Sequence, residues 1–322
     1  MSDDQILGGP AADRMMLVET FVRIVDAGSL SAAARLLGTT QPTVSRRLKA
    51  FEKSLGVRLL QRSTHAMTLT DDGMRCYARA RELIAGWQAF ESEIKGAGDE
   101  PVGLLRVLAP HAFGQQQLVA PLADYLARYP RMAVEWTLHD RTPDFIGEGI
   151  DCAIRVGEIP DPSVVAIRLG DVPRIVVASP ALLDGAAVPL HPNGLQDLPW
   201  IAASNFYRDE VVLTHAATGA THRLPIRPRL TTDNMYAQRN AAALGVGVTI
   251  GSTWALREQL DRGELVQLAP DWHAPTLPIW LIYPPARFYP ARLRRFIEIM
   301  RVAVPGAFGI TPPPPAPPPG SP

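Results

Sequence analysis

Three short helical patterns lie within the first seventy residues of this chain. Apolar residues at helical spacing predict a first helix that ends near residues 26–28, and Ser29 is placed to cap a second, alanine-rich helix. After a turn at residues 38–40, a third helix begins with Thr40 as its N-cap and Pro42 in its first turn, where proline is tolerated. Three short helices, two of them joined by a tight turn, predict a helix-turn-helix.

The third helix is expected to have two different faces. The apolar stripe expected to be buried consists of Val44, Leu48, Phe51 and Leu55. The opposite face holds Thr43, Arg46, Arg47 and Ala50, beside Gln41 at the helix start. Gln, Thr and Arg side chains at this end of a helix can hydrogen-bond base edges and phosphates in a major groove. An ordinary polar helix surface would show the same spacing, so both interpretations remain open.

Charge is distributed unevenly along the chain. The whole sequence has 32 basic and 32 acidic residues, whereas residues 14–70 contain nine basic and only three acidic ones. A basic module joined to a near-neutral remainder is typical of a protein that binds the phosphate backbone of nucleic acid. A merely solvated helical surface is the alternative explanation of the excess positive charge.

A short β-hairpin, or wing, is expected after the third helix. Residues 57–60 and 67–69 flank the polar stretch 61–65. Arg62 and Thr64 lie at its tip, where they could reach the phosphate backbone or the minor groove.

The segments 29–37, 40–48 and 52–62 together resemble the winged helix-turn-helix of LysR-type transcriptional regulators. The resemblance rests on Gln-Pro-x-Val-Ser-Arg, which starts at Gln41, and on Leu-Gly-x-x-Leu-x-x-Arg, which starts at Leu55. Phe51 and Leu60 exchange aliphatic and aromatic character with the residues usual in the family. The resemblance implies that the residues at or near the DNA are Gln41, Pro42, Thr43, Ser45, Arg46 and Arg62.

Residues 71–95 predict a long helix with an apolar seam of nearly heptad period. The residues of this seam are Tyr77, Ala80, Ile84, Trp87, Phe90 and Ile94. Such a seam predicts dimerisation between two helices, with packing of the helix on its own domain as the alternative. The resemblance also implies a dimerising linker helix here, and a two-fold dimer would place two recognition helices on successive turns of DNA.

Residues 96–101 are rich in glycine and predict a flexible hinge. Beyond the hinge, strand-like and helix-like patterns alternate, which predicts an α/β fold with mostly parallel sheets. The strands expected are 104–108, 134–138, 152–156, 175–178, 200–203 and 246–250, and the helices are 116–129, 144–149, 235–244 and 255–262. Two such lobes would bind ligands in the crevice between them.

The resemblance extends over this region, which implies a two-lobed, periplasmic-binding-protein-like effector domain at residues 102–304. The first lobe would comprise residues 102–173 and 276–304, and the second lobe residues 174–275. The residues expected to face the cleft are Pro110, His111, Ala112, Phe113, Ser204, Asn205, Asp233 and Asn234. Free N–H groups at helix starts favour anions, although Asp233 opposes this preference. His111 stands where the family often has a small hydroxyl residue, and His111 and Phe113 could instead pack between the lobes.

Other functional classes lack support in the sequence. Cys76 and Cys152 are far apart and predict neither a disulfide framework nor a zinc site. The Gly245-Val-Gly247 segment lacks the third glycine and the strand-to-helix order of a dinucleotide-binding turn. We therefore expect no enzyme, cofactor or metal site; a hydrolase or transferase with scattered catalytic residues is the remaining alternative. We also expect no membrane segment or secretory signal, and a proline-rich disordered tail at 305–322 that is either inert or a docking motif.

The sequence thus predicts a cytoplasmic transcriptional regulator without catalytic activity. As a homodimer or a dimer of dimers, a homotetramer, the protein would bind and bend an interrupted palindrome in double-stranded promoter DNA. A small-molecule effector would modulate this binding, and contact with RNA polymerase is expected. The effector, the regulated genes and the choice between activation and repression are not predicted.

Overall fold

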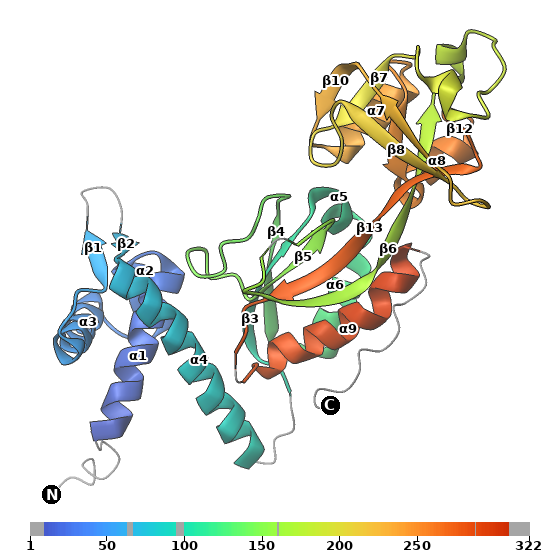
Figure 1. Cartoon of the computed structure of the whole chain (residues 1–322). Coiled ribbons are helices and arrows are strands. Elements are labelled where there is room, and N and C mark those ends of the chain that lie inside the picture. Colours follow the sequence, from blue (N-terminus) through green and yellow to red (C-terminus); the bar gives the residue numbers. More distant parts are fainter. Residues whose placement is uncertain (1–9, 63–66, 95–99, 160, 287, 309–322) are drawn as a thin grey trace, which may run out of the picture.

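The computed structural model describes residues 10–62, 67–94, 100–159, 161–286 and 288–308. A helical N-terminal module, a long helix and two α/β lobes follow one another along the molecule (Figure 1). No helix in these described ranges is both long enough and apolar enough to cross a membrane.

The N-terminal module is a three-helix core with a small hairpin. Its elements are α1 (Pro10–Ala27), α2 (Leu30–Leu36), α3 (Gln41–Leu55), β1 (Leu60–Arg62) and β2 (Met67–Leu69). Helix α1 packs against both α2 and α3, and Phe21 of α1 and Val44 of α3 are fully buried in the shared core. Ser29 caps α2 by accepting a hydrogen bond from the backbone N–H of Ala32, as predicted. Strands β1 and β2 pair antiparallel and form the base of the wing.

Helix α4 (Asp71–Ile94) starts inside this module and then leaves it. Tyr77 is only 1% exposed and makes an edge contact with Phe21, at a ring-centroid distance of 6.5 Å. The prediction that Tyr77 lies on a free dimerisation seam is therefore wrong, because the core of its own module buries this side chain. Further along α4, Trp87 and Phe90 are about half exposed, at 48% and 52%. The side chain of Ile94 and the hinge residues 95–99 lie outside the description.

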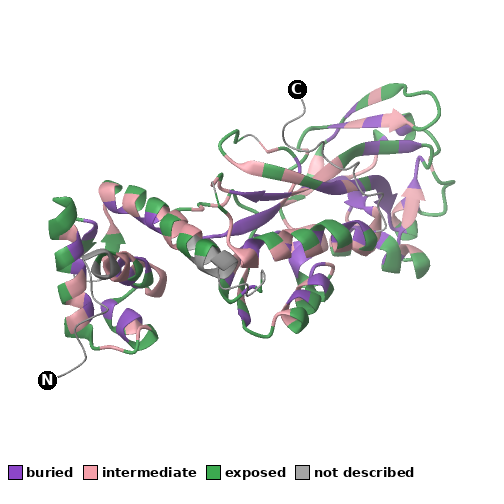
Figure 2. Cartoon of the chain, turned by 90° about the horizontal axis from the view of Figure 1, so that it is seen from below, coloured by how far each residue is buried: buried purple, intermediate pink, exposed green. Residues whose placement is uncertain are grey.

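The first lobe is built on parallel strands covered by helices. Its elements are β3 (Gly103–Ala109), α5 (His111–Gln115), α6 (Val119–Arg128), β4 (Met132–Leu138), β5 (Cys152–Val156) and α9 (Ala291–Phe308). Strand β3 pairs in parallel with both β4 and β5. Figure 2 shows buried residues concentrated on the strands and on the inward sides of the helices. Tyr125 of α6 and Phe296 of α9 meet edge to face over the sheet, at 5.5 Å between ring centroids.

The second lobe has a separate core around the fully buried Trp200. Its elements are η1 (Pro180–Leu183), η2 (Pro192–Leu195), β7 (Trp200–Ala203), β8 (Glu210–His215), β9 (Thr221–Pro225), β10 (Pro228–Thr232), α7 (Met235–Ala243), β11 (Thr249–Ser252), α8 (Thr253–Asp261) and β12 (Val266–Leu268).

Two long strands, β6 (Val165–Ala178) and β13 (Trp272–Tyr283), run through both lobes and connect them (Figure 1). The two strands pair antiparallel, with a register from Val165 opposite Tyr283 to Arg174 opposite Ala274. Strand β11 also pairs antiparallel with β6. The expectation of mostly parallel sheets is wrong for these strands, because the chain crosses between the lobes twice in opposite directions.

Two smaller expectations are also corrected. Residues 144–149 form a turn instead of a helix, and the Asp144 side chain accepts a hydrogen bond from the Gly147 N–H at 2.8 Å. Helix α9 continues beyond residue 304 to Phe308, which is only 6% exposed and packs on Phe113. The folded domain therefore includes residues 305–308, which were assigned to the tail; residues 309–322 lie outside the description.

Candidate functional site

The N-terminal end of α3 presents a polar surface to solvent. Thr40 caps the helix, since its hydroxyl accepts from the Thr43 backbone N–H, and Gly56 ends it in a left-handed conformation with φ of 73°. Gln41, Pro42 and Arg46 are exposed, while Thr43, Ser45 and Arg47 are partly exposed. Among the described residues, Arg46 and Arg47 have no ion-pair partner, so both guanidinium groups are free to meet phosphates or bases.

The buried side of α3 fixes this polar surface in place. Val44, Leu48 and Phe51 are buried against the other helices, whereas Leu55 is 46% exposed. The prediction that Leu55 completes the buried stripe is therefore wrong, because the helix ends at this turn and leaves the module core. Glu52 contributes a contact that the sequence did not indicate: its carboxylate accepts from the backbone N–H of Leu59 at 2.9 Å and ties α3 to the wing.

The wing is described only in part. Arg62 is the last residue of β1, paired with Met67 of β2. The side chain of Arg62 and the whole of Thr64 lie outside the description, so their expected DNA contacts stay predictions.

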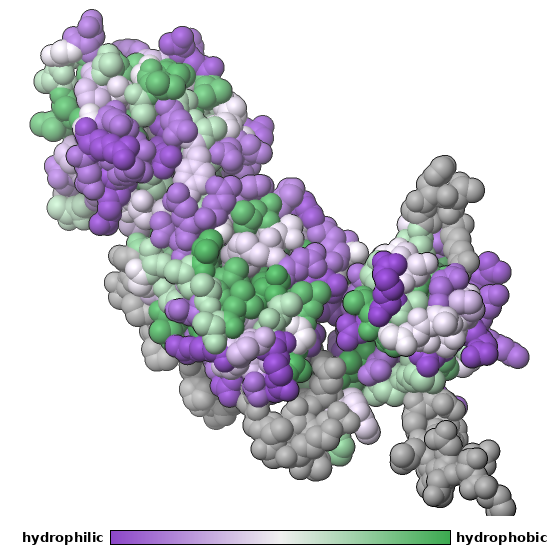
Figure 3. Space-filling model, turned by 180° about the vertical axis from the view of Figure 1, so that it is seen from behind, coloured by the Kyte–Doolittle hydropathy of each residue, from purple (hydrophilic) through white to green (hydrophobic). Residues whose placement is uncertain are grey.

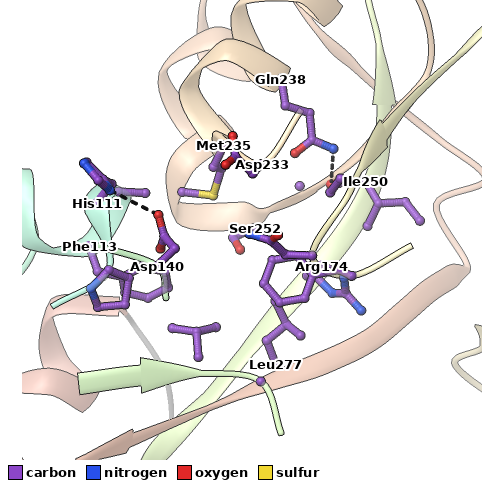
Figure 4. Close-up of a pocket in the computed structure, with 18 of the residues that line it drawn as sticks. His111, Phe113, Asp140, Arg174, Asp233, Met235, Gln238, Ile250, Ser252 and Leu277 are labelled. Atoms are coloured by element: carbon purple, nitrogen blue, oxygen red, sulfur yellow. Dashed lines mark hydrogen bonds and ion pairs between the residues drawn. The ribbon is translucent and has the colours of Figure 1, made fainter. Parts of the chain in front are cut away.

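The second candidate site is a cavity of about 570 Å³ between the two lobes. Figure 4 shows His111, Phe113 and Asp140 on the first lobe, facing Asp233, Met235 and Gln238 on the second. Of the residues expected to face the cleft, seven line this cavity: Pro110, His111, Ala112, Phe113, Asn205, Asp233 and Asn234. Ser204 does not; its backbone N–H donates to the carbonyl of Thr232 and its hydroxyl lies 3.5 Å from the Asn205 side chain.

Residues at the cavity also hold the two lobes together. Phe113 is 5% exposed and packs against Trp254 of the second lobe, at 5.1 Å between ring centroids. The Tyr236 hydroxyl donates to the Ala112 carbonyl across the lobes at 3.0 Å. Phe113 therefore packs between the lobes, which was the alternative interpretation of this residue, and it also borders the cavity.

His111 is placed differently from Phe113. Its side chain is 41% exposed, and its Nδ1 lies 3.2 Å from Oδ2 of Asp140. Asp140 also lines the cavity. Among the described residues, no cluster of three or more His, Cys, Asp or Glu side chains is arranged to hold a metal ion.

Several cavity residues carried no sequence signal. Arg174, Gln238 and Ser252 are buried polar residues of the second lobe that line the cavity. Gln238 donates to the Tyr207 hydroxyl at 2.8 Å and to the Ile250 carbonyl at 3.3 Å, which fixes α7 against β11. Of these three buried side chains, only that of Arg174 carries a charge.

Comparisons with known proteins match both regions. A model of the family described as bacterial regulatory helix-turn-helix protein, lysR family, matches residues 15–74, and a model described as LysR substrate binding domain matches residues 98–304. The HTH-type transcriptional regulator PtxR of Pseudomonas aeruginosa is 31% identical over 87% of this chain and 90% of its own length. An HTH-type transcriptional repressor of P. aeruginosa strain UCBPP-PA14 is 31% identical over 89% of this chain and 90% of its own length.

A solved structure also matches almost the whole chain. The full-length structure of AphB, a virulence activator of Vibrio cholerae in the LTTR protein family, is 27% identical. The match has a TM-score of 0.54 and covers 89% of this chain and 98% of AphB.

Proposed function

Because this chain belongs to the LysR family of transcriptional regulators, we propose that it binds promoter DNA through α3 and senses a small molecule between its two lobes. The observation that carries the DNA-binding part is the exposed polar end of α3, with Gln41, Pro42 and Arg46 outermost. A helix of this kind enters the major groove with its N-terminal residues against the base edges. Thr43, Ser45 and Arg47 flank the same surface, and Arg62 and Thr64 of the wing would reach the backbone.

We propose that α4 forms the dimer contact. Leu83, Trp87 and Phe90 are exposed at 54%, 48% and 52% and follow helical spacings of four and three. The rings of Trp87 and Phe90 lie 5.7 Å apart and form one apolar surface that water does not favour. Ile84 is partly covered by the N-terminal module and Ile94 lies further along the same helix, so these two would extend the contact.

A two-fold dimer would recognise an interrupted palindrome, because each recognition helix reads one half-site. Hydrophobic side chains also gather on one face of the first lobe (Figure 3), which suits a further contact in a dimer of dimers. From the promoter, the assembly would contact RNA polymerase in the cytoplasm. One relative is described as a repressor and AphB as an activator, so the family match does not show whether this chain activates or represses transcription.

The cavity is suited to transmit a signal because both connecting strands border it. Arg174 of β6 and Leu277 of β13 line it, and the lobes close on it through Phe113 and Tyr236. A ligand with unequal affinity for two lobe arrangements would shift their populations, and hence the spacing of the two α3 helices in the dimer. We propose that this shift changes DNA binding and bending.

The relatives reported above are transcriptional regulators, and we propose that this chain likewise catalyses no reaction. Turnover of a small molecule by the purified protein would contradict this part of the proposal.

The DNA-binding proposal is tested by selecting ligands for the full chain from duplexes of random sequence. The selected sites should contain two inverted half-sites whose centres are one helical turn, or a multiple of one turn, apart. Arg46→Ala should then weaken binding to the selected duplex by about tenfold or more, as expected for loss of a base or phosphate contact. The measurement is a gel-shift titration, together with the thermal unfolding temperature of each variant.

Arg257→Ala is the matched control, since Arg257 is an exposed arginine on α8 of the second lobe. This variant should bind the duplex like the unmodified chain. Unchanged affinity of Arg46→Ala, or selected sites without inverted symmetry, would contradict the proposal.

A further inference from the structure

The basic side chains that line the cavity differ in the hydrogen-bond and ion-pair partners that the protein provides for them. His111 faces the carboxylate of Asp140, and Nη1 of Arg155 donates to the Asp140 carbonyl at 2.9 Å and to that of Arg141. Within the described residues neither arginine has an Asp or Glu side chain at ion-pair distance, but Arg155 is partly exposed and donates to two carbonyls, whereas Arg174 is buried and donates only its Nε, to the Pro275 carbonyl.

Arg174 is held where the two lobes join. It lies on β6, opposite Ser252 of β11 on one side and Ala274 of β13 on the other. The residue is only 8% exposed, and its Nε donates to the Pro275 carbonyl at 2.8 Å, which fixes the guanidinium plane. Burial lowers the pKa of Arg174 to about 10, so the group still carries its charge at neutral pH.

A buried cation without a carboxylate partner is costly for the folded protein, because the charge has lost most of its hydration. Guanidinium groups pair most strongly with planar oxyanions, above all carboxylates, through two parallel hydrogen bonds. Among the described residues, the cavity lining offers Arg174 no carboxylate at ion-pair distance. The hydroxyl of Ser252, next to Arg174 across the strand pair, can donate a further hydrogen bond to the same anion.

The rest of the cavity limits the ligand further. The ring of Phe206 lies over the Arg174 guanidinium at 5.7 Å, and Met235, Ile250 and Leu277 add apolar surface. Figure 4 places Arg174 and Leu277 beside the connecting strands and Asp233 at the α7 side.

Three acidic residues also line the cavity: Asp140, Glu158 and Asp233. Asp140 has His111 as a partner, but no ion-pair partner is described for Glu158 or Asp233. A second carboxylate on the ligand would meet their negative charge and be disfavoured.

We propose that the cavity binds a small organic monocarboxylate, with its carboxylate on Arg174 and its apolar body against Phe206, Met235 and Leu277. The inference rests on the proposed ligand-sensing function of this cavity and adds the chemical class of the ligand. It also assigns Arg174, a residue outside the expected cleft set, as the anchoring group.

The test is thermal-shift and calorimetric titration of the full chain without DNA. The probes are hexanoate and phenylacetate, their uncharged amides hexanamide and phenylacetamide, and the dicarboxylate adipate. We expect at least one monocarboxylate to stabilise the protein at millimolar concentration, with its amide and adipate binding at least about tenfold more weakly.

Arg174→Met should lower the affinity for that monocarboxylate by about tenfold or more, the usual effect of losing a charge-assisted hydrogen-bonded pair. Arg174→Lys keeps the positive charge and should lose less of this affinity. This second variant keeps the test valid if Arg174→Met disturbs the fold. Arg168→Met is the matched control: Arg168 is an exposed residue on the same strand, outside the cavity, and pairs with the partly exposed Asp171.

Absence of stabilisation by any monocarboxylate, equal binding of acid and amide, or unchanged affinity in Arg174→Met and Arg174→Lys would each overturn the inference. An uncharged ligand that alters DNA binding, and whose affinity is the same in the Arg174 variants, would also overturn the inference. That result would still agree with the proposed function. A monocarboxylate that binds through Arg174 but never alters DNA binding would support the inference and contradict the proposed function.

Discussion

Among single residues, Gly245 and Gly247 show why a position can require glycine. Their spacing resembles the start of a dinucleotide-binding turn, but the structure gives them another role. Gly245 has φ of 79° and follows the end of α7, where a left-handed residue is needed. Gly247 lies against the backbone that leads into β7: a Cβ there would be 2.7 Å from the Pro199 carbonyl oxygen. The close approach lets the Val248 N–H donate to this carbonyl.

Gly247→Ala should therefore lower the free energy of unfolding by about 1–3 kcal/mol, the usual cost of overpacking against an atom that cannot move away. Denaturant titration of the full chain measures this change. Gly306→Ala is the control, since no atom lies within 4 Å of a Cβ at this exposed position in α9. It should raise the free energy by about 0.5–1 kcal/mol through better helix propensity. Equal stability of the two variants would show that the Pro199 contact is not tight.

At the scale of elements, short-range signals were predictable and long-range pairing was not. The caps at Ser29 and Thr40 are confirmed, because each depends on atoms within a few residues. Strand β13 was missed: Pro275 and Pro278 within it argue against a strand by sequence rules, and its pairing with β6, β5 and β8, all distant in sequence, stabilises it there. The hairpin of β8 and β9 and the short helix α5 also escaped prediction.

The same distinction between short-range and long-range signals explains which residues of the candidate sites could be predicted from the sequence. The turn at residues 110–113 and the start of α7 could be expected at the cavity, because helix starts after strands face a cleft in this kind of fold. Arg174 and Leu277 could not, because their position depends on how two strands far apart in sequence pair across the lobes. On α4, the repeat spacing was correct, but which residues stay exposed depends on where the helix leaves the N-terminal module.

Across the chain as a whole, a partly buried charge network joins the N-terminal module to the first lobe. Asp26 of α1 accepts a hydrogen bond from the Tyr77 hydroxyl at 2.5 Å and pairs with Arg106 of β3 at 3.4 Å. Burial raises the pKa of Tyr77 well above its ordinary value, and the Asp26 carboxylate adds to this shift, so the phenol stays a donor.

Asp151 forms the other half of this network. It is 9% exposed and pairs with Arg81 of α4 and, at 3.6 Å, with Arg292 of α9. Its carboxylate also accepts from the Arg106 backbone N–H at 2.8 Å. The network thus fixes α1 and α4 against the lobe that borders the ligand cavity, and offers a physical path between the two candidate sites.

Asp151→Asn keeps the shape of the side chain but leaves two arginines without their anion, so it should lower the free energy of unfolding by about 1–3 kcal/mol. The exposed pair of Glu210 and Arg223 is the control, and Glu210→Gln should cost less than about 1 kcal/mol because solvent screens that pair. Differential scanning calorimetry of both variants makes the comparison. A loss for Asp151→Asn no larger than that of the control would mean that the network contributes little to domain contact.

We propose that a ligand in the cavity controls how the chain binds and bends DNA. The most direct measurement is a titration of the selected duplex, labelled at both ends for energy transfer, with the full chain in the presence and absence of a cavity ligand. Energy transfer reports affinity and bending in one experiment. We expect saturating ligand to change the affinity, the end-to-end distance of the bound duplex, or both. If a ligand demonstrably occupies the cavity and changes neither quantity, the cavity does not control DNA binding.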